Sequence, residues 1–392
     1  MTGTGPPAGG SEGPAAGAEQ LGEQVEGGPA ARWPRSSASS AGSARRPGPR
    51  SGCRAATDDR IGVPDGAGGV LARAPRYAGR VGPARVLTGE FRLVCQARRG
   101  EGRRVNRQPL RLAIIEATRI LERAGVASPR FDAEVIAAHV LGVERGRLPM
   151  VPLVDPPVIE AIGQLVQQRA KRIPLQYLTG WAALGDITVA VGAGVFVPRP
   201  ETELLLEWGV KFLQGREFPV VVDLCTGSGA LALAVAHARP DAVVYAVDID
   251  PQALAWARHN ADVHADAGNT PIRLYSGDIG DPTMFAELDG LVDLVLCNPP
   301  YVPEGTPVPP EVAEHDPPRA VFAEESGLAV IRHAIAAGAR LLRPGGGLAI
   351  EHDDTHGSAV PALVRARRVL TGVEGHTDLT GRARFVTARR LG

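Results

Sequence analysis

The segment Asn298-Pro299-Pro300-Tyr301 follows an apolar run, residues 292–297, that is typical of a buried strand. Two consecutive prolines cannot continue a helix or donate to a sheet ladder, so the strand must end there. The prolines also hold the backbone rigidly between an amide side chain and a phenol. The segment therefore presents fixed polar and aromatic groups at the carboxyl end of a strand.

This arrangement suits methyl transfer to a planar NH2 group, whose nitrogen is a poor nucleophile because its lone pair is delocalised. If the Asn298 side-chain oxygen and the Pro299 carbonyl both accept from the NH2 group, they fix its orientation and favour a tetrahedral geometry. Tyr301 is placed to stack on the planar group. Asn298, Pro299 and Tyr301 are our candidate catalytic residues, and with Pro300 they form the candidate substrate site.

A glycine-rich turn follows a second apolar run, residues 219–224. Gly227 and Gly229 flank Ser228 where a strand is predicted to lead into a helix. The glycines let a ligand approach the backbone closely, and the helix N-terminus offers free N–H groups. This turn alone is a weak signal, because a turn without a ligand also fits it.

Acidic residues end the next two predicted strands. Asp248 lies about twenty positions after the glycine turn, where a carboxylate can bind both hydroxyls of a ribose. Asp250 before Pro251 has the pattern of a helix N-cap and is expected to be structural. Asp278 could accept from an adenine amino group, although an ordinary turn Asp is nearly as common. These features fit NAD and S-adenosylmethionine about equally, and the Asn-Pro-Pro-Tyr segment favours S-adenosylmethionine.

Strand and helix patterns alternate from residue 219 onward. The predicted strands cover residues 219–224, 243–248, 272–276, 292–297 and 347–351, with a last pair within 365–389. The predicted helices cover residues 229–238, 251–261 and 326–342. Such alternation predicts an open, mainly parallel α/β sheet covered by helices. In such sheets ligands bind beyond the carboxyl ends of the strands, at the switch in strand order.

The chain before this sheet changes character twice. Up to residue 107 it is rich in Gly, Pro, Ala, Ser and Arg without sustained periodicity. We expect a disordered, dispensable extension there rather than an arginine-rich RNA-binding arm. Apolar spacing then predicts three helices, over 110–125, 128–142 and 157–171, followed by a β-hairpin. The predicted order is extension, helical domain, hairpin linker and sheet domain, over residues 1–107, 108–180, 181–197 and 198–392.

Charge is distributed unevenly along the 392 residues, although the formal net charge is zero. Residues 1–107 hold 17 arginines and 9 acidic residues, so the remainder carries an equal excess of negative charge. A folded part with a net negative charge is not built primarily to hold a phosphate backbone, so we expect no direct nucleic-acid binding. No apolar run approaches the length of a membrane span.

Cysteine and histidine patterns favour neither a disulfide frame nor a metal site. The four cysteines are widely spaced without a CxxC pair, which fits a reducing cytosol. His352 and His356 imitate a zinc helix but lack the Glu of H-E-x-x-H, so we expect no metal. With no secretion signal at the N-terminus, we expect a cytoplasmic protein, and we expect a monomer.

These motifs, with PLQYLTG (174–180), VPRPETELLLE (197–207) and SPRFDAEVIAAHVLG (128–142), resemble the release-factor glutamine N5-methyltransferase family. The resemblance covers about residue 110 to the end. It implies a helical N-terminal domain that helps to bind the substrate and a class I methyltransferase domain that uses S-adenosylmethionine. The implied substrate is the glutamine of the Gly-Gly-Gln tripeptide in class I peptide chain release factors.

The resemblance also assigns the methyl-donor site by position. With Asp278 added, the candidate cofactor-binding residues are Cys225, Thr226, Gly227, Ser228, Gly229, Asp248, Asp278, Ile279 and Asn298. Three departures occur: Cys225 stands where glycine is usual, Ile279 where an aromatic residue often stacks on adenine, and Glu-His-Asp (351–353) where the family tends to have Glu-Ile-Gly. The Ile279 contact is therefore the weakest of these inferences.

Alternatives stay open at several points. Glu201 and Glu203 could be catalytic, or could contact the donor or the domain interface, but directly after Pro200 they more simply begin a helix, whose N-terminus favours acids. Asn-Pro-Pro-Tyr also serves amino groups of nucleic-acid bases, which would call for a basic cleft or a target-recognition domain. A relative that methylates a ribosomal-protein glutamine differs after Val-Pro-Arg. A non-catalytic dinucleotide-binding module leaves Asn-Pro-Pro-Tyr unexplained.

Overall fold

The computed structural model describes residues 106–392, so the expected N-terminal extension lies outside the described residues. The three predicted helices of the next part are confirmed, and a short one follows them. They are α1 (Leu110–Arg123), α2 (Pro129–Leu141), α3 (Pro156–Ala170) and α4 (Leu175–Thr179). A 3-10 turn (Arg145–Met150) and a two-residue pairing of β1 (Gln108–Pro109) with β2 (Leu153–Val154) complete this part.

These helices pack because apolar residues recur on one face of each. Leu121, Ile136 and Ile162 meet in a core from which water is excluded. Gly142 ends α2 in the left-handed conformation (φ 63°), which glycine adopts at no steric cost. The apolar periodicity thus determined both the extent of each helix and its buried face, while the exact domain limits stay a prediction.

The predicted hairpin is also present. Strands β3 (Trp181–Leu184) and β4 (Ile187–Ala190) pair antiparallel. The alternating residues Leu184, Ile187 and Val189 are buried against the core of the main sheet. The hairpin therefore belongs by its packing to the sheet that follows.

The main sheet has seven strands in the order β12-β13-β11-β8-β5-β6-β7. Their bounds are β5 (Val220–Leu224), β6 (Val243–Asp248), β7 (Arg273–Ser276), β8 (Val292–Cys297), β11 (Leu342–Glu351), β12 (Leu370–Thr377) and β13 (Ala383–Arg390). Five neighbouring strands, from β11 to β7, run parallel, and β13 pairs antiparallel with both β11 and β12. The mainly parallel α/β sheet is therefore confirmed.

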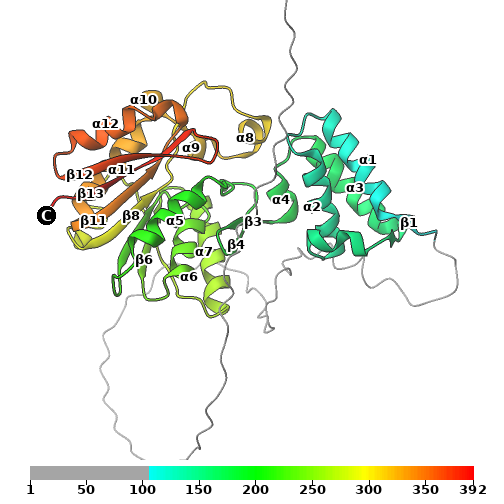
Figure 1. Ribbon diagram of the computed structural model, residues 1–392, viewed down its shortest axis with the longest axis horizontal. Helices are drawn as coiled ribbons and strands as arrows, with labels where there is room; N and C mark the ends of the chain where they lie inside the picture. Colours follow the sequence, from blue (N-terminus) through cyan, green and yellow to red (C-terminus); the bar gives the residue numbers. More distant parts are fainter. Residues whose placement is uncertain (1–105) are drawn as a thin grey trace, which may run out of the picture. The chain divides into compact units, whose positions relative to one another are not determined.

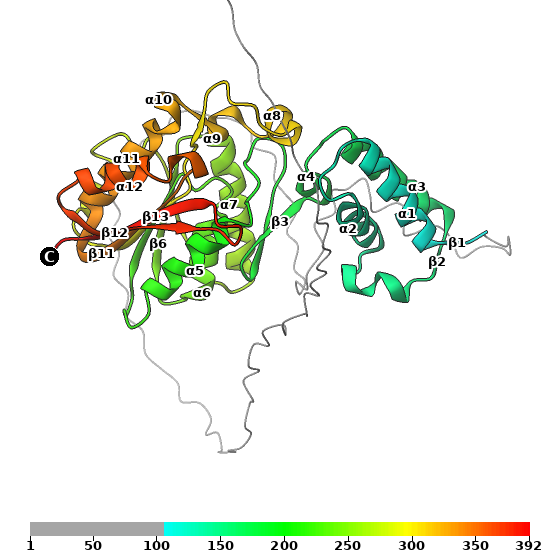
Figure 2. The ribbon, with the colours of Figure 1, turned by 45° about the horizontal axis from the view of Figure 1, so that its top comes forward.

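Helices cover both faces of this sheet (Figures 1 and 2). One face packs against α5 (Thr202–Phe212), α6 (Ala230–Ala238) and α7 (Pro251–Asp266). The other packs against α11 (Ala329–Leu341) and α12 (Ala359–Ala366). The central strand β8 is buried along its whole length, as expected for a strand covered on both sides.

A long connection joins β8 to α11. It contains β9 (Val302–Pro303), α8 (Pro310–His315), α9 (Pro318–Val321), β10 (Phe322–Ala323) and α10 (Glu324–Gly327), and β9 pairs parallel with β10. Two 3-10 turns, Ala286–Leu288 and Asp354–His356, complete the elements. Among the described residues, no helix combines the length and apolar character needed to cross a membrane.

The strand order reverses between β5 and β8. The chain runs outward from β5 through β6 to β7, then returns to place β8 on the other side of β5. Leu224 of β5 is in register with Cys297 of β8. The glycine turn and the Asn-Pro-Pro-Tyr segment therefore begin side by side at the switch in strand order, where ligands bind in such sheets.

Candidate active site

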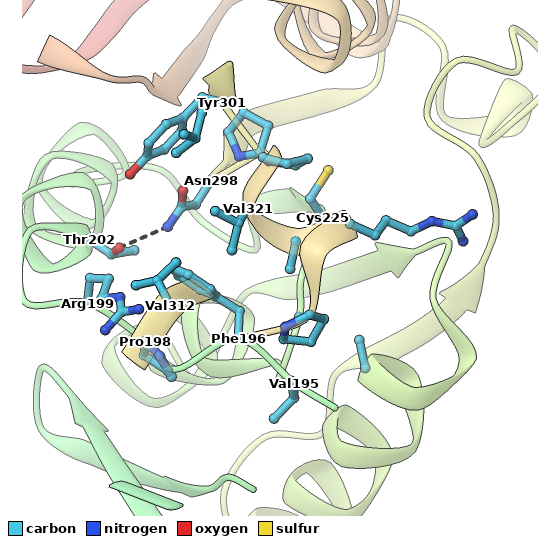
Figure 3. A pocket seen from close by; sticks show the side chains of 18 of the residues that line it. Val195, Phe196, Pro198, Arg199, Thr202, Cys225, Asn298, Tyr301, Val312 and Val321 are labelled. Carbon is cyan, nitrogen blue, oxygen red and sulfur yellow. Dashed lines mark hydrogen bonds between the residues drawn. The ribbon is translucent and has the colours of Figure 1, made fainter. Parts of the chain in front are cut away.

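A cavity of about 1570 Å³ lies at the carboxyl ends of the parallel strands. Every predicted site residue except Gly229 lines it: Cys225, Thr226, Gly227, Ser228, Asp248, Asp278, Ile279, Asn298, Pro299, Pro300 and Tyr301. Figure 3 shows Cys225, Asn298 and Tyr301 around the cavity, with Thr202 close to Asn298. We call the part around Asp248, the candidate site of the methyl donor, the donor end. We call the part around Asn298, the candidate site of the group that accepts the methyl, the acceptor end.

The glycine turn at the donor end is held by hydrogen bonds within the protein. The N–H groups of Thr226, Gly227 and Gly229 donate to Val247 O, Asp248 Oδ2 and Thr226 O. These three N–H groups are therefore not available to a ligand, because the turn uses them to fix its own shape, while the expected free N–H groups of the helix that begins at Ala230 stay a prediction.

The two glycines serve different purposes. Gly227 has φ +57°, and no atom lies within 4 Å of where a Cβ would stand, so a ligand can reach its backbone. Gly229 has φ +81°, and a Cβ at this position would stand 3.4 Å from the Ala257 Cβ, so the glycine lets α6 pack closely on α7. Gly229 thus supports the turn from behind, which is why it does not line the cavity.

Asp248 is held ready to accept hydrogen bonds from a ligand. Its Oδ2 accepts from Gly227 N at 2.8 Å and its Oδ1 from Asp250 N at 2.9 Å. Burial raises the pKa of this carboxyl, and the backbone N–H bonds oppose that rise. Each oxygen keeps a second lone pair, so the carboxylate fits two neighbouring hydroxyl groups of a ribose.

The remaining donor-end predictions are placed as follows. Asp250 caps α7 by accepting from Gln252 N at 2.8 Å, which confirms its structural role. Asp278 accepts from Gly280 N at 2.7 Å, so it holds a turn while also lining the cavity. Ile279 lines the cavity beside it and packs partly on the core, which gives an apolar wall suited to a nucleoside base.

A buried carboxylate, Asp223, lies under the glycine turn. It is 1% exposed and accepts from Thr226 Oγ1 at 2.6 Å. Burial raises its pKa to about 7, although the Thr226 bond acts in the opposite direction. Sequence reasoning passed over Asp223 because it lies within a predicted strand, yet it lines the cavity and fixes the Thr226 hydroxyl.

Cys225 adopts the left-handed conformation, with φ +58°. A side chain is strained there, which gives a physical reason for the glycine that the resemblance leads one to expect at this position. Its thiol lies against that of Cys297, and burial together with this contact raises the pKa of Cys297. Within residues 106–392, no group of three or more His, Cys, Asp or Glu side chains is arranged to hold a metal ion.

The acceptor end is built from a chain of side-chain hydrogen bonds. Asn298 Nδ2 donates to Thr202 Oγ1 at 3.0 Å, drawn as a dashed line in Figure 3. Thr202 Oγ1 in turn donates to Glu351 Oε2 at 2.9 Å. The Tyr301 hydroxyl donates to Glu351 Oε1 at 3.1 Å. The amide oxygen of Asn298 lies on the other side of the side chain from Thr202 (Figure 3).

Strand register brings these residues together. Ile350 of β11 is opposite Cys297 of β8, so Glu351 and Asn298 follow at the same level of adjacent strands. Glu351 is 2% exposed and Thr202 is 4% exposed. Burial raises the pKa of Glu351 to about 7, while the hydrogen bonds from Thr202 and Tyr301 hold it down.

Sequence reasoning missed Thr202 and Glu351 as site residues. Thr202 lies inside the PRPETE stretch, where only its two acidic neighbours were considered, and these were expected to begin a helix. Glu201 precedes α5 and Glu203 lies in its first turn, where Glu203 accepts from Gly185 N at 3.3 Å. The signal that would have identified Glu351 is a charged residue directly after the apolar run of β11, beside the end of β8.

Comparisons with known proteins agree with this geometry. The family described as PrmC N-terminal domain matches residues 113–180, and the family described as Methyltransferase small domain matches residues 188–314. The first match covers the helical part, and the second covers the sheet through the Asn-Pro-Pro-Tyr segment to α8.

Three curated relatives carry the name release factor glutamine methyltransferase. The protein of Mycolicibacterium smegmatis is 52% identical over 282 residues, which is 72% of this chain and 98% of that protein. Those of Corynebacterium glutamicum and Streptomyces coelicolor are 47% and 43% identical, over 71% of this chain and 98% and 96% of their own lengths. Because the match covers 96–98% of the length of each of these relatives, the chain belongs to the release factor glutamine methyltransferase family.

Proposed function

We propose that this protein transfers a methyl group from S-adenosylmethionine to the side-chain nitrogen of the glutamine in the Gly-Gly-Gln tripeptide of class I peptide chain release factors. The observation that carries the proposal is the state of Asn298. Its Nδ2 is bound to Thr202, and within residues 106–392 no donor reaches its Oδ1. A fixed, unused acceptor at the cavity wall is what an NH2-bearing substrate requires.

The donor end fits S-adenosylmethionine by the chemistry of its side chains. Asp248 would accept from both ribose hydroxyls, with Asp278 and Ile279 beside the adenine and Cys225 to Ser228 along the rest of the nucleoside. When bound, this cofactor supplies an electrophilic methyl group on a sulfonium. The open space at Gly227 gives the nucleoside room to lie against the backbone.

The acceptor end would orient the glutamine. Asn298 Oδ1 and the Pro299 carbonyl oxygen accept from the two hydrogens of its NH2 group, which directs the nitrogen lone pair towards the donor end. Tyr301 lines the cavity beside them, with its hydroxyl bound to Glu351, so its ring is held in place for stacking. Catalysis by position needs no strong base, and water takes the surplus proton from the methylated nitrogen.

One labelling experiment tests the proposal. The protein is incubated with tritiated S-adenosylmethionine in three separate reactions, which contain class I release factors, ribosomes or DNA. We expect label on the release factors, with a mass increase of about one CH2 placed by peptide mass spectrometry on the Gly-Gly-Gln glutamine. Label on a ribosomal protein or on DNA would instead support one of the two alternative substrates, and the proposed substrate would be wrong.

A further inference from the structure

The hydrogen bonds that end at Glu351 have a direction. A threonine hydroxyl carries one hydrogen, and an ionised carboxylate can only accept. Thr202 must therefore donate its hydrogen to Glu351, at 2.9 Å. Its oxygen is then an acceptor towards Asn298, at 3.0 Å.

This direction determines which end of the Asn298 amide faces the cavity. Only the NH2 end can donate to Thr202, so the carbonyl end must lie on the opposite side, as Figure 3 shows. The two ends of an amide are nearly the same size, so packing alone hardly distinguishes them. The orientation of the amide is therefore set by the charge on Glu351, which is linked to Asn298 by two successive hydrogen bonds.

A protonated Glu351 would remove this constraint. Its own O–H could donate to Thr202, whose hydrogen would then be free to bond the Asn298 oxygen. The amide could turn over, and its NH2 group would face the cavity. A substrate NH2 group would then meet a donor where it needs an acceptor, and an unpaired polar group would be left at the site.

We propose that Thr202 and Glu351 are positioning residues, which hold the Asn298 amide with its oxygen towards the substrate only while Glu351 is ionised. The proposal rests on the proposed function, since it assumes that the substrate presents an NH2 group to Asn298. Neither residue needs to touch the substrate to act in this way.

Several charged or titratable groups face Glu351. Arg384 of β13 favours its ionised form, and Glu201 before α5 opposes it. Tyr301 donates to it from the segment after β8, and Cys297 at the end of β8 is also near, while Asp353 beyond β11 acts on Tyr301. Burial outweighs Arg384, so the pKa of Glu351 lies at about 7 and its ionised fraction rises with pH through neutrality.

The first test compares Thr202→Val, which keeps the shape of the side chain without the hydroxyl, with Thr202→Ser, which keeps the hydroxyl. We expect turnover with a release factor to fall ten- to a hundredfold in the Val variant and to stay within about threefold of wild type in the Ser variant. The affinity for S-adenosylmethionine, measured by calorimetry, should stay the same in both. Wild-type turnover in a folded Val variant would overturn the proposal.

The second test is a pH profile, which a merely structural role would not change. Wild-type kcat/KM should fall as the pH decreases through about 7. In Glu351→Gln the rate should be low and this acid limb should disappear, because Gln can donate to Thr202 at every pH. Glu203→Gln, a charge change in the same segment, should keep the wild-type profile. An acid limb that persists in Glu351→Gln would mean that another group, such as Asp223, produces it and that the proposal is wrong.

The outcomes also separate this inference from the proposed function. If wild type labels a different NH2-bearing substrate, the proposed substrate is wrong. The turnover of the same variants is then compared on that substrate. If wild type labels release factors while the Val and Gln variants match it, the function stands and the positioning roles are wrong. If Thr202→Val does not fold, the Ser variant and the Glu351→Gln profile decide alone.

Discussion

The two ends of the cavity are held by different kinds of interaction. At the donor end, backbone N–H groups hold the carboxylate that we propose to bind the ribose, since Gly227 N and Asp250 N both donate to Asp248. At the acceptor end, two side chains from distant parts of the chain hold Asn298, Thr202 directly and Glu351 through Thr202. Thr202 is 96 residues from Asn298 and 149 residues from Glu351.

This difference suits what each end must bind. A nucleoside presents many groups, so a rigid backbone turn can serve it with little dependence on any one side chain. A single NH2 group offers only two hydrogens, so its orientation depends on one amide and on whatever fixes that amide. We therefore expect single substitutions to affect turnover most at the acceptor end and donor affinity most at the donor end.

The largest effect is expected for Asn298→Ala. Removal of the oriented oxygen should lower turnover with a release factor by about a hundred- to a thousandfold, as the loss of one preorganised polar group typically does. Donor affinity should fall much less, because Asp248 and the glycine turn remain. Methyl transfer assays and calorimetry measure the two quantities.

Asn298→Asp is the matched control for that change, because it keeps an oxygen but adds a charge, and partial activity is expected. Full activity of the Ala variant would remove Asn298 from the mechanism and erase the contrast between the two ends.

Glu351 should make stability depend on pH. Its pKa is raised from an ordinary 4.5 to about 7, so the folded protein holds a proton that the unfolded chain releases. Stability from this group is therefore fully present below about pH 4.5 and is lost as the pH rises to about 7, by roughly 3 kcal/mol at about 1.4 kcal/mol per pKa unit. In urea unfolding, the free energy of unfolding should decrease less between pH 5 and pH 8 for Glu351→Gln than for wild type.

Asp223→Asn is the donor-end counterpart, since burial also raises the pKa of Asp223 to about 7. This change should also reduce the decrease in the free energy of unfolding between pH 5 and pH 8, without changing the orientation of Asn298. An unchanged pH dependence in Glu351→Gln would show that its carboxyl titrates alike in the folded and unfolded states.

Asp248→Ala should weaken the binding of S-adenosylmethionine by roughly 2–3 kcal/mol, because the acceptor for two ribose hydroxyls is lost. Turnover at saturating donor should change far less, which is the reverse of the Asn298 result. Asp278→Ala, which removes a carboxylate that mainly holds its own turn, should have a smaller effect. Unchanged calorimetric affinity in Asp248→Ala would place the ribose elsewhere.

The smallest effect is expected for Cys225→Gly. The φ of +58° strains any side chain, so glycine should stabilise the fold by up to about 1 kcal/mol and raise Tm by about 2–4 °C. Donor affinity should stay the same. Gly227→Ala, the opposite change at φ +57°, should lower Tm, and a lower Tm for Cys225→Gly would mean that contacts of the thiol outweigh the backbone strain.

The same contrast explains what could be predicted from the sequence. Periodicity and turn residues act over a few positions, so most predicted helices and strands and the Asp250 cap agree with the observed ones, although α7 and β11 are each five residues longer than predicted. The Asn-Pro-Pro-Tyr segment and Asp248 were found because each carries its signal within one short motif. Thr202 and Glu351 carry no such signal, because their importance comes from strand register and from a shared hydrogen bond.

The sequence also could not show how the glycine turn uses its N–H groups. A Gly-x-Gly pattern predicts a tight turn with accessible backbone, which is correct for Gly227. Whether an N–H group is free depends on what stands opposite it, and here Asp248 from the next strand occupies one of them. Local pattern predicts the shape of the turn, and tertiary contact determines which of its groups remain for a ligand.

The placement of Glu351 at the end of β11 has a consequence for the newly made chain. Strands β5, β6 and β7 are consecutive along the chain and neighbours in the sheet, so the donor end is encoded in one continuous stretch. The acceptor end needs Glu351, which leaves the ribosome about fifty residues after Tyr301. During synthesis the turn that we propose to bind the nucleoside is therefore complete before the chain can orient a substrate, and only a nearly finished chain can become an active enzyme.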